Sequence, residues 1–423
     1  MFSESKDFGE LALAFTDEFT WCWDDKGTGG ANWVSFWHPK ALDGFRALGT
    51  MAMPAWESAN LAARNPNSAA ASKTKEHIVA LCVKQGDGQA AKAASTPALA
   101  SPTDYEQVWT DVGSGGTYKG SVWRPVPPKG YVAMGCVVPE NTYEKPPLDA
   151  VWCVRRDLAF RSATKFVYDD RKTRAKFRLS VWRNIATPEY NSTDGTVEAL
   201  IAPNAFAAHQ SWSQPDGLPE MYILCLPLPT DAPDPGAFPQ LTSREKPAEK
   251  TLERVAEVAW IPFSAVKEDK DYSVPWKLEN SPFYKIERKV RWALAGHINN
   301  TTSVNQKTTA STTVGTEESY ANTWGISAGF TVSATAGYNV GVQTGSVTLT
   351  FSLTGNFSET RTWKKMESVT WTKELVAPPG KAAAEWVVNN SIQLVRGDGS
   401  RFGSPLTFND ATSTHFDEYP DPD

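Results

Sequence analysis

The most restrictive feature of the sequence is a long stretch without any formally charged residue. No Asp, Glu, Lys or Arg occurs between residues 319 and 358, although these residues make up 21% of the chain. From Ile326 to Val342 apolar residues, alanine and tyrosine occupy every even position, and serine, threonine, glycine and asparagine occupy every odd one. Because successive side chains of a β-strand point to opposite faces, this alternation predicts a strand with one apolar and one polar face.

The same stretch predicts an antiparallel hairpin, because the phase of the alternation changes after Thr344–Gly345. A two-residue loop there requires such a change, since directly opposed residues of an antiparallel pair share a face. The expected opposing pairs are Val342 with Val347, Val340 with Leu349, Tyr338 with Phe351, and Ala336 with Leu353. The hairpin as a whole, about residues 326–357, then keeps one apolar and one polar face.

The length of this hairpin favours a pair of strands that crosses a membrane. At about 3.3 Å per residue the first arm exceeds a hydrocarbon core of about 30 Å. The positions expected to face lipid are Ile326, Phe330, Val332, Tyr338, Val340, Val342, Val347, Leu349 and Phe351. Those expected to line a wet lumen are Ser327, Thr331, Ser333, Asn339, Ser346, Thr348, Thr350 and Ser352. The alternative is a hairpin that covers one side of a soluble β-sandwich, but a solvated face usually carries Lys or Glu.

The composition indicates a β-rich protein of two or three domains in its 423 residues. A formal net charge of −6 argues against nucleic acid as a partner. The five cysteines are widely spaced, mostly among apolar neighbours, which predicts buried free thiols. Neither they nor the histidines show metal-ligand spacing, and no GxSxG motif occurs. We therefore expect no metal, no cofactor and no enzymatic activity.

Targeting signals of the common kinds are not evident in the sequence. The N-terminal residues lack the basic and apolar regions of a Sec signal peptide, and no apolar run has the length of a membrane helix. We expect a protein that is made in soluble form and acts outside the producing cell, on the membrane of a target cell.

The first half of the chain contains three copies of one pattern. Two copies are closely alike and read WDDKGTGG…FWHP from Trp23 and WTDVGSGG…VWRP from Trp109. The third, from Val167, lacks the glycines but keeps a paired Asp and a Val-Trp-Arg. Each copy predicts strand, turn and strand, and three such units around one axis predict a pseudo-threefold β-prism; two would suit a sandwich. Residues 56–100, rich in Ala, Ser and Lys, are expected to form a surface insertion.

The repeated aspartates are the candidate receptor-binding or glycan-binding groups, namely Asp24, Asp25, Asp111, Asp169 and Asp170. Their carboxylates could bind sugar hydroxyls or a hard cation. Alternatively, each Asp could cap its own turn by accepting backbone N–H groups, which the turn sequences favour. The repeated Trp37, Trp123 and Trp182 are expected in the core rather than as platforms for sugar stacking.

These repeats, together with Val151-Trp152-Cys153-Val154-Arg155-Arg156-Asp157-Leu158, resemble the vacuolar protein sorting-associated protein sixty-two family over roughly residues 8–190. The resemblance implies a β module that can occur on many proteins, so it does not fix a function. Because the third copy is altered, a threefold binding site does not follow from it.

The second half of the chain begins after a proline-rich segment, so we divide the chain into residues 1–225, a linker at 226–250 and residues 251–423. A short helix is expected at Lys250–Glu257, and long strands at Tyr284–Leu294, Thr360–Val376 and Ala384–Val395.

The segment Glu279–Arg288 and the Ser/Thr-rich strands after it resemble aerolysin-type β-pore-forming proteins, which include bacterial insecticidal toxins, over about residues 255–400. The resemblance implies a monomer that binds a cell-surface receptor, a glycan or a lipid, and self-associates into a ring. Each protomer then donates one hairpin to a closed barrel in the target membrane, where β-structure must have no unpaired edge. The alternative is a lectin-like or sorting-adaptor protein without pore activity.

Overall fold

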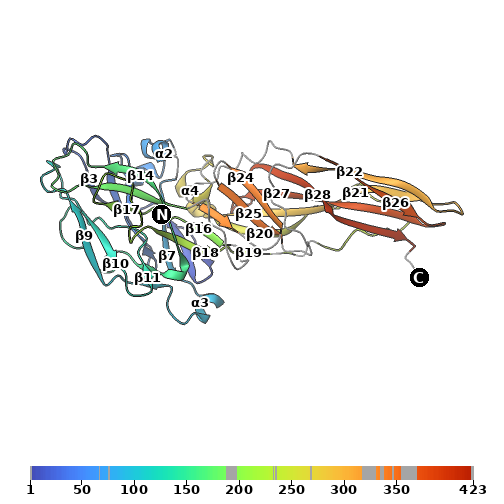
Figure 1. Ribbon diagram of the computed structural model, residues 1–423, viewed down its shortest axis with the longest axis horizontal. Helices are drawn as coiled ribbons and strands as arrows, with labels where there is room; N and C mark the ends of the chain where they lie inside the picture. The colour runs from blue at the N-terminus through green and yellow to red at the C-terminus, as the bar shows by residue number, and fades with distance from the viewer. Residues whose placement is uncertain are drawn as a thin grey trace.

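The computed structural model describes residues 2–65, 67–74, 77–186, 198–231, 233, 236–266, 269–316, 330–333, 338–344, 347–353 and 369–420. The molecule is elongated, with the N-terminal half at one end and long C-terminal strands at the other (Figure 1). It is mainly β, with an N-terminal prism and an extended antiparallel C-terminal sheet. The fold class predicted from the sequence is therefore confirmed.

The three sequence repeats form three small sheets. They are β3 (Phe19–Asp24), β4 (Ser35–Pro39) and β6 (Met51–Met53); β9 (Asp104–Thr110) and β10 (Ser121–Val126); and β14 (Ala163–Asp169), β15 (Ser180–Ile185) and β17 (Phe206–His209). The leading hairpin of each sheet has a register shift at the equivalent place, next to Trp23, Trp109 and Tyr168. A shared bulge in three hairpins is the structural counterpart of the repeat and supports the prism.

A second repeated feature holds the side chain of the tryptophan that recurs in all three copies. Its indole N–H donates to the serine hydroxyl two residues earlier, and that hydroxyl donates to a backbone carbonyl in the next segment. The indole–hydroxyl distances are 2.8 Å for Trp37–Ser35, 2.9 Å for Trp123–Ser121 and 2.8 Å for Trp182–Ser180. All three tryptophans are buried, so the expectation that they belong to the core is confirmed.

Side chains from all three sheets meet on the prism axis. Trp23, Trp109 and Tyr168 hold equivalent positions there and are almost fully buried, with Phe206 and Val181 packed around them. The rings of Trp23 and Trp109 meet edge to face at 5.4 Å. A single apolar core therefore joins the three copies.

Three further sheets lie between the prism and the C-terminal half. The first consists of β1 (Lys6–Phe8), β2 (Leu11–Thr16), β7 (Ala80–Gln85) and β5 (Arg46–Ala47), and the second of β11 (Tyr131–Val132), β12 (Cys153–Arg155) and β8 (Leu99–Ala100). The third consists of β13 (Ala159–Arg161), β18 (Tyr222–Pro227) and β16 (Glu198–Ile201), and it continues into β23 (Phe330–Ser333), β25 (Val347–Leu353) and β24 (Tyr338–Thr344).

The expected surface insertion, residues 56–100, is only partly at the surface. It carries the short helices α1 (Ala59–Ala62), α2 (Ala69–Thr74) and α3 (Gln89–Ala93), but also β7, which lies between β2 and β5. Leu81 and Val83 of β7 are buried in the main core, so their apolar side chains make this part of the insertion structural. None of the described helices is long and apolar enough to span a bilayer.

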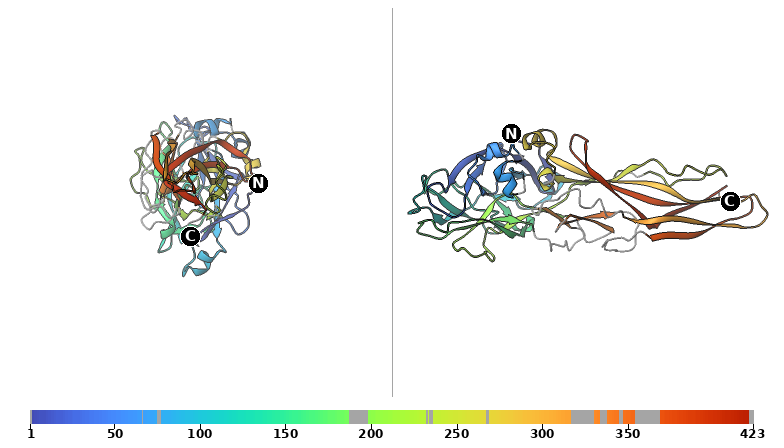
Figure 2. Two further views of the ribbon diagram at one scale, coloured as in Figure 1. Left: turned by 90° about the vertical axis from the view of Figure 1, so that its right-hand side faces the viewer. Right: turned by 90° about the horizontal axis from the view of Figure 1, so that it is seen from above.

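The C-terminal half is a seven-stranded antiparallel sheet in the order β19 (Thr230–Asp231), β20 (Arg254–Pro262), β21 (Phe283–Asn299), β27 (Ala382–Val395), β28 (Arg401–Tyr419), β22 (Gln306–Thr316) and β26 (Val369–Ala377). Its long strands run along the molecule in the right-hand view of Figure 2. The predicted strands at 284–294 and 384–395 are confirmed by β21 and β27. Residues 360–368 of the third predicted strand lie outside the described residues.

The short helix expected at Lys250–Glu257 is wrong. Val255 and Glu257 instead pair with Lys289 and Arg288 of β21, because backbone pairing with a long neighbour outweighs a weak local helix preference. The helix that does form here is α4 (Val274–Asn280), whose N-cap Ser273 accepts from the Trp276 N–H.

One apolar core joins the two halves of the molecule. It contains Phe15 of β2 and Leu226 of β18 together with Ile261 of β20, Ile286 of β21 and Leu394 of β27. The division at residue 225 therefore does not separate two independent cores. The proline-rich segment also packs rather than hanging free, since buried Leu241 contacts the cluster around Trp386, and its N–H donates to Asp417 Oδ2 at 2.6 Å.

The turns that connect β3 to β4, β9 to β10 and β14 to β15 each have a left-handed backbone conformation at the same position. This shared conformation allows a test of whether the three turns are structurally equivalent. Gly27, Gly113 and Lys172 have φ of 85°, 87° and 69°. We expect Gly113→Ala to lower the free energy of unfolding by about 1–2 kcal/mol, since a Cβ is disfavoured there and would lie 3.2 Å from the Arg174 carbonyl oxygen. Lys172→Gly should raise it by up to about 1 kcal/mol.

Urea unfolding followed by tryptophan fluorescence measures both changes. Ala175→Gly, in the same turn, serves as the control for added backbone freedom and should be mildly destabilising. A destabilisation by Lys172→Gly as large as that of the control would contradict the equivalence of the three turns.

Candidate functional site

The turns between the two leading strands of each repeat meet at one end of the prism. We call residues 25–34, 111–120 and 170–179 the prism tip. Three backbone hydrogen bonds close them into a ring: Ala31 N–H to the Arg171 carbonyl at 3.1 Å, Thr117 N–H to the Lys26 carbonyl at 3.1 Å, and Lys176 N–H to the Val112 carbonyl at 3.2 Å. The tip lies at the end of the molecule remote from β22 and β26 (Figure 1).

Three of the predicted aspartates hold equivalent positions in these turns. Asp25, Asp111 and Asp170 are buried, with 2%, 4% and 3% of their surface exposed. Each carboxylate accepts from an aromatic donor of its own copy, at 2.5 Å from Trp56 Nε1, 2.8 Å from the Tyr143 hydroxyl and 2.6 Å from Trp212 Nε1, respectively. Asp25 and Asp111 also accept from the N–H groups of Val34 at 3.0 Å and Gly120 at 2.9 Å.

The other two predicted aspartates, Asp24 and Asp169, precede them in the first and third copies. Each accepts from the backbone N–H two residues later, that of Lys26 or Arg171, at 3.2 Å. Each also pairs with the side chain of that residue, at 3.1 Å and 3.4 Å. All five carboxylates thus have the turn-capping geometry that the alternative interpretation predicts, and receptor binding by them stays a prediction.

Burial shifts the pKa of two of these carboxyl groups. It raises the pKa of Asp25 and of Asp170, against the lowering effect of the hydrogen bonds that both accept. Within the described ranges no cluster of three or more His, Cys, Asp or Glu side chains could hold a metal ion. The expected free thiols are confirmed, since all five cysteines are buried and none forms a disulfide.

The charge-free stretch supplies three described strands to the last N-terminal sheet. β23 pairs antiparallel with β16 over residues 198–201 and parallel with β25 at Val332 and Leu349. β24 pairs antiparallel with β25 on its other side. Of the predicted hairpin positions, Ile326, Ser327 and Ser346 lie outside the described residues.

The predicted hairpin needs two corrections in this structure. First, the register differs from the expected one: Val342, Val340 and Tyr338 pair with Leu349, Phe351 and Leu353, each two residues later than predicted. Ala336, of the fourth predicted pair, lies outside the described residues. A shift of two preserves the faces, since the period of a strand is two.

Second, the first arm is not one straight strand from Ile326 to Val342. β23 is parallel to β25 whereas β24 is antiparallel to it, so β23 and β24 run in opposite directions. The physical reason is that β23 completes its backbone ladder on the edge of β16, which fixes its direction.

The register aligns the apolar positions of the hairpin with the core-facing positions of β16. Ala199 and Ile201 face the main core and pair with Val332 and Phe330. Leu200, on the opposite face, pairs with Thr331. The register therefore places Val332 and Phe330, two predicted lipid-facing positions, opposite core-facing residues of β16, and Thr331, a predicted lumen-facing position, opposite Leu200.

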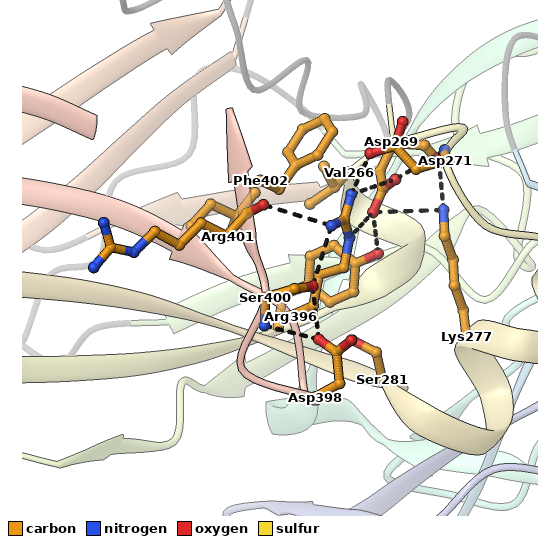
Figure 3. A network of polar contacts seen from close by, with 12 residues as sticks. Val266, Asp269, Asp271, Lys277, Ser281, Arg396, Asp398, Ser400, Arg401 and Phe402 are labelled. Atoms are coloured by element: carbon orange, nitrogen blue, oxygen red, sulfur yellow. Dashed lines mark hydrogen bonds and ion pairs between the residues drawn. The ribbon is translucent and has the colours of Figure 1, made fainter. Parts of the chain in front are cut away.

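A buried ionic network stands where the C-terminal sheet meets the N-terminal half (Figure 3). Arg396, at the end of β27, binds Asp269 through two bonds of 2.7 Å and 3.0 Å and also reaches Asp271 at 2.6 Å. Lys277 of α4 donates to the Asp269 carbonyl, and the Tyr284 hydroxyl donates to its carboxylate. The network ties one loop, one helix and two strands together.

Burial and ion pairing shift the pKa values of the charged groups in this network. Burial alone would raise the pKa of Asp269, but the hydrogen bonds from Arg396 and Tyr284 outweigh it and leave that pKa below its usual value. Burial lowers the pKa of Lys277 to about 8. Sequence reasoning did not find this network, because Asp269 and Arg396 lie far apart in the chain and match no motif.

His77 of the N-terminal half packs against the same region. Its Nε2 lies 3.2 Å from the Val266 carbonyl oxygen, and its ring lies 5.5 Å from that of Phe263. Burial, and then the charge of Lys277, lower the pKa of His77 to about 4. A small cavity of about 60 Å³ adjoins it, lined by His77, Asn184 and Ser264 among others. That volume suits one or two water molecules rather than an organic ligand.

Residues 3–232 match the family described as vacuolar protein sorting-associated protein 62. The matched region covers more than half of the chain and contains the prism and the neighbouring sheets except for β23, β24 and β25. The chain belongs to the vacuolar protein sorting-associated protein 62 family. The resemblance noted from the repeats over residues 8–190 is thereby confirmed, and the family region extends to β19.

Two solved structures are similar to parts of this member of the vacuolar protein sorting-associated protein 62 family. GNIP1Aa from Chromobacterium piscinae is 22% identical with a TM-score of 0.37, and the match covers 50% of this chain and 35% of that one. Cry35Ab1 is 10% identical with a TM-score of 0.30, and the match covers 98% of this chain and 91% of that one. No curated protein matches the chain.

The position of His77 predicts an acid-sensitive joint between the two halves. The folded chain keeps His77 neutral down to about pH 4, whereas the unfolded chain takes up a proton near pH 6.5. Stability is therefore expected to fall as the pH drops from about 6.5 to 4, with a contribution from His77 of about 3 kcal/mol. His77→Gln keeps a donor toward the Val266 carbonyl but cannot titrate, so it should flatten the decline.

Urea unfolding at a series of pH values from neutral to acidic measures this effect. His209→Gln, which removes a partly exposed histidine far from the joint, should leave the slope as in the parent protein. An equal slope for His77→Gln and the parent would show that His77 is not the group responsible.

Proposed function

We propose that this protein is a β-pore-forming toxin, with insect cells as the target that the resemblance of its C-terminal half implies. The N-terminal domain binds a cell-surface receptor, a glycan or a lipid. The bound chains self-associate into a ring, and each contributes its hairpin to a shared barrel in the target membrane. The proposal requires no catalytic group and no cofactor.

The observation that carries the proposal is the pairing of β24 with β25. Within a segment free of charged residues, Tyr338, Val340 and Val342 are opposite Leu353, Phe351 and Leu349. Asn339, Gly341 and Gln343 are opposite Ser352, Thr350 and Thr348. We call β23, β24 and β25 together the ribbon. In β24 and β25, apolar residues are opposite apolar ones and polar residues are opposite polar ones, as a strand pair needs between lipid and a water-filled lumen.

The attachment of this ribbon to the N-terminal domain is short enough to be reversed. Four residues of β16 pair with four of β23. At about 0.5–1.5 kcal/mol for each net backbone hydrogen bond, the ladder is worth a few kcal/mol. Binding that favours the released state by a similar amount, such as ring assembly at a surface, can offset it.

A second candidate function is a binding or sorting adaptor without pore activity. It is favoured by one observation, namely that β23 extends the sheet of the N-terminal domain through β16. In that case the ribbon would be a permanent part of the scaffold. Dye release from vesicles separates the two functions, because only the toxin permeabilises membranes.

A reversible cross-link between β16 and β23 tests whether the ribbon must leave. Ala199 and Val332 are directly paired, so Ala199→Cys with Val332→Cys should form a disulfide under oxidation. Cys225 pairs with Leu200, on the opposite face, and should not compete. The oxidised variant should bind target membranes but release no dye, and reduction should restore release. Release is measured from brush-border or lipid vesicles loaded with a self-quenching dye.

The two single variants, treated with the same oxidant, are the controls and should release dye like the parent. Full release from the oxidised double variant, with the disulfide shown by mass spectrometry, would refute the required detachment. Near-ultraviolet circular dichroism establishes that the double variant is folded.

The parity of the ribbon provides an independent test. An environment-sensitive dye attached through Val340→Cys or Val342→Cys should shift to an apolar signal when membranes are added. The matched variants Asn339→Cys and Gln343→Cys should stay in a polar environment. The five native cysteines are buried, so labelling of the folded protein is confined to the new thiol. Equal polar signals at both parities would exclude insertion of this ribbon.

A further inference from the structure

We propose that the third turn of the prism tip, residues 171–178, docks the protein onto an anionic phospholipid surface. This inference deepens the proposed function and rests on it for the identity of the first partner, since it names the chemistry that the N-terminal domain would recognise.

The turn departs from its two equivalents in a chemically specific way. The first copy reads Asp-Lys-Gly-Thr-Gly-Gly-Ala-Asn-Trp and the second Asp-Val-Gly-Ser-Gly-Gly-Thr-Tyr-Lys, with glycine and small residues through the turn. The third reads Asp-Arg-Lys-Thr-Arg-Ala-Lys-Phe-Arg. Lys172, Arg174 and Lys176 thus replace small neutral residues, and the turn holds five cations where each of the other two holds one, in a chain whose net charge is −6.

The fold holds these cations at the surface and leaves most of them without an acidic partner. Arg171, Lys172, Arg174, Lys176 and Arg178 are all exposed. Arg171 pairs with Asp169 at 3.4 Å. Within the described part of the chain, the other four have no carboxylate oxygen within the 4.0 Å that defines an ion pair. Asp170, which precedes the turn, is buried and accepts from two indoles.

The same hydrogen bonds that close the tip make the turn rigid. Its backbone is tied to the other two turns through Arg171 and Lys176. The guanidinium groups of Arg171 and Arg178 also lie 5.6 Å and 4.7 Å from the ring of Trp212. Cations that are already positioned lose little conformational entropy on binding, so more of their attraction to a charged surface is retained.

Apolar side chains lie among the cations, where a membrane interface would receive them. Phe177, between Lys176 and Arg178, is 48% exposed, and Val112, whose carbonyl accepts from Lys176 N–H, is 47% exposed. Tyr118 of the neighbouring turn is 40% exposed. An exposed phenylalanine flanked by cations is suited to the boundary between head groups and acyl chains.

The shape of the tip is better suited to binding a membrane surface than to binding a sugar in a pocket. The cavity of about 60 Å³ described above is lined by none of the tip residues. The tip itself is made of three turns at the end of the molecule (Figure 1). Each cation near an anionic leaflet adds to the attraction, so the four cations without an ion pair to a described carboxylate would act together. The remaining chain is net acidic and would be repelled, which orients the tip toward the membrane.

Vesicle sedimentation with the full chain tests the inference. The probes are vesicles of phosphatidylcholine alone and of phosphatidylcholine mixed with phosphatidylserine. We expect binding to the mixed vesicles to be at least about tenfold tighter and to weaken with added salt. The double variant R174E/K176E should lose at least about tenfold on the mixed vesicles. K92E/K129E, with the same change in net charge on exposed residues away from the tip, should bind like the parent.

Several results would overturn the inference. They are equal binding to both kinds of vesicle, equal losses for the two double variants, or retention on an immobilised sulfated glycan that is lost in R174E/K176E while vesicle binding is not. The turn carries few structural contacts through these two side chains, and an unchanged urea midpoint establishes folding.

Dye release from the same vesicles separates this inference from the proposed function. Binding to anionic vesicles through the tip, without dye release under any condition, would support the inference and contradict pore formation. Dye release from target membranes without any preference for anionic lipid would contradict the inference alone.

Discussion

A β-strand edge that is buried must find a backbone partner, and this constraint determines how the two halves of the molecule are joined. β16 has β18 on one side, and without β23 its other edge would be open. The partner comes from a segment more than a hundred residues later in the chain, the one segment that carries no charge. Backbone groups that are left unpaired away from water cost free energy, so this edge is a stable place for the ribbon in the absence of a membrane. A closed barrel would satisfy the same backbone groups with neighbouring protomers instead.

The threefold prism could be predicted from the sequence because each copy repeats residues that have a definite structural role. The aspartate caps its turn, the glycine adopts a left-handed backbone, and the serine and tryptophan two residues apart bond to each other. The third copy retains these duties without its glycines: Lys172 adopts the left-handed conformation in place of glycine. The alternation of the long C-terminal strands was likewise sufficient to locate β21 and β27.

Other parts of the structure were beyond local patterns. The reversal between β23 and β24 depends on the edge of β16, and alternation alone says nothing about which partner a strand will choose. The binding of Arg396 to Asp269 joins groups 127 residues apart, neither of which lies in a motif. The packing of the proline-rich segment along β28 depends on Leu241 and Asp417, which composition does not single out. Those features arise from long-range contacts without a sequence signature, whereas the turn caps and the serine–tryptophan bonds that reveal the prism lie within each copy.

The distribution of partners along the chain has a consequence for biosynthesis. As the ribosome releases the polypeptide, the ring of backbone bonds among the three turns can close once residue 176 has emerged. The sheet that contains β16 cannot be completed until residues 330–333 have been synthesised. The core shared by both halves cannot be completed until Ile392 and Leu394 have been synthesised. The nascent N-terminal portion therefore carries an open, apolar-faced edge during much of translation. A chaperone that recognises extended apolar segments would have its longest opportunity during this interval.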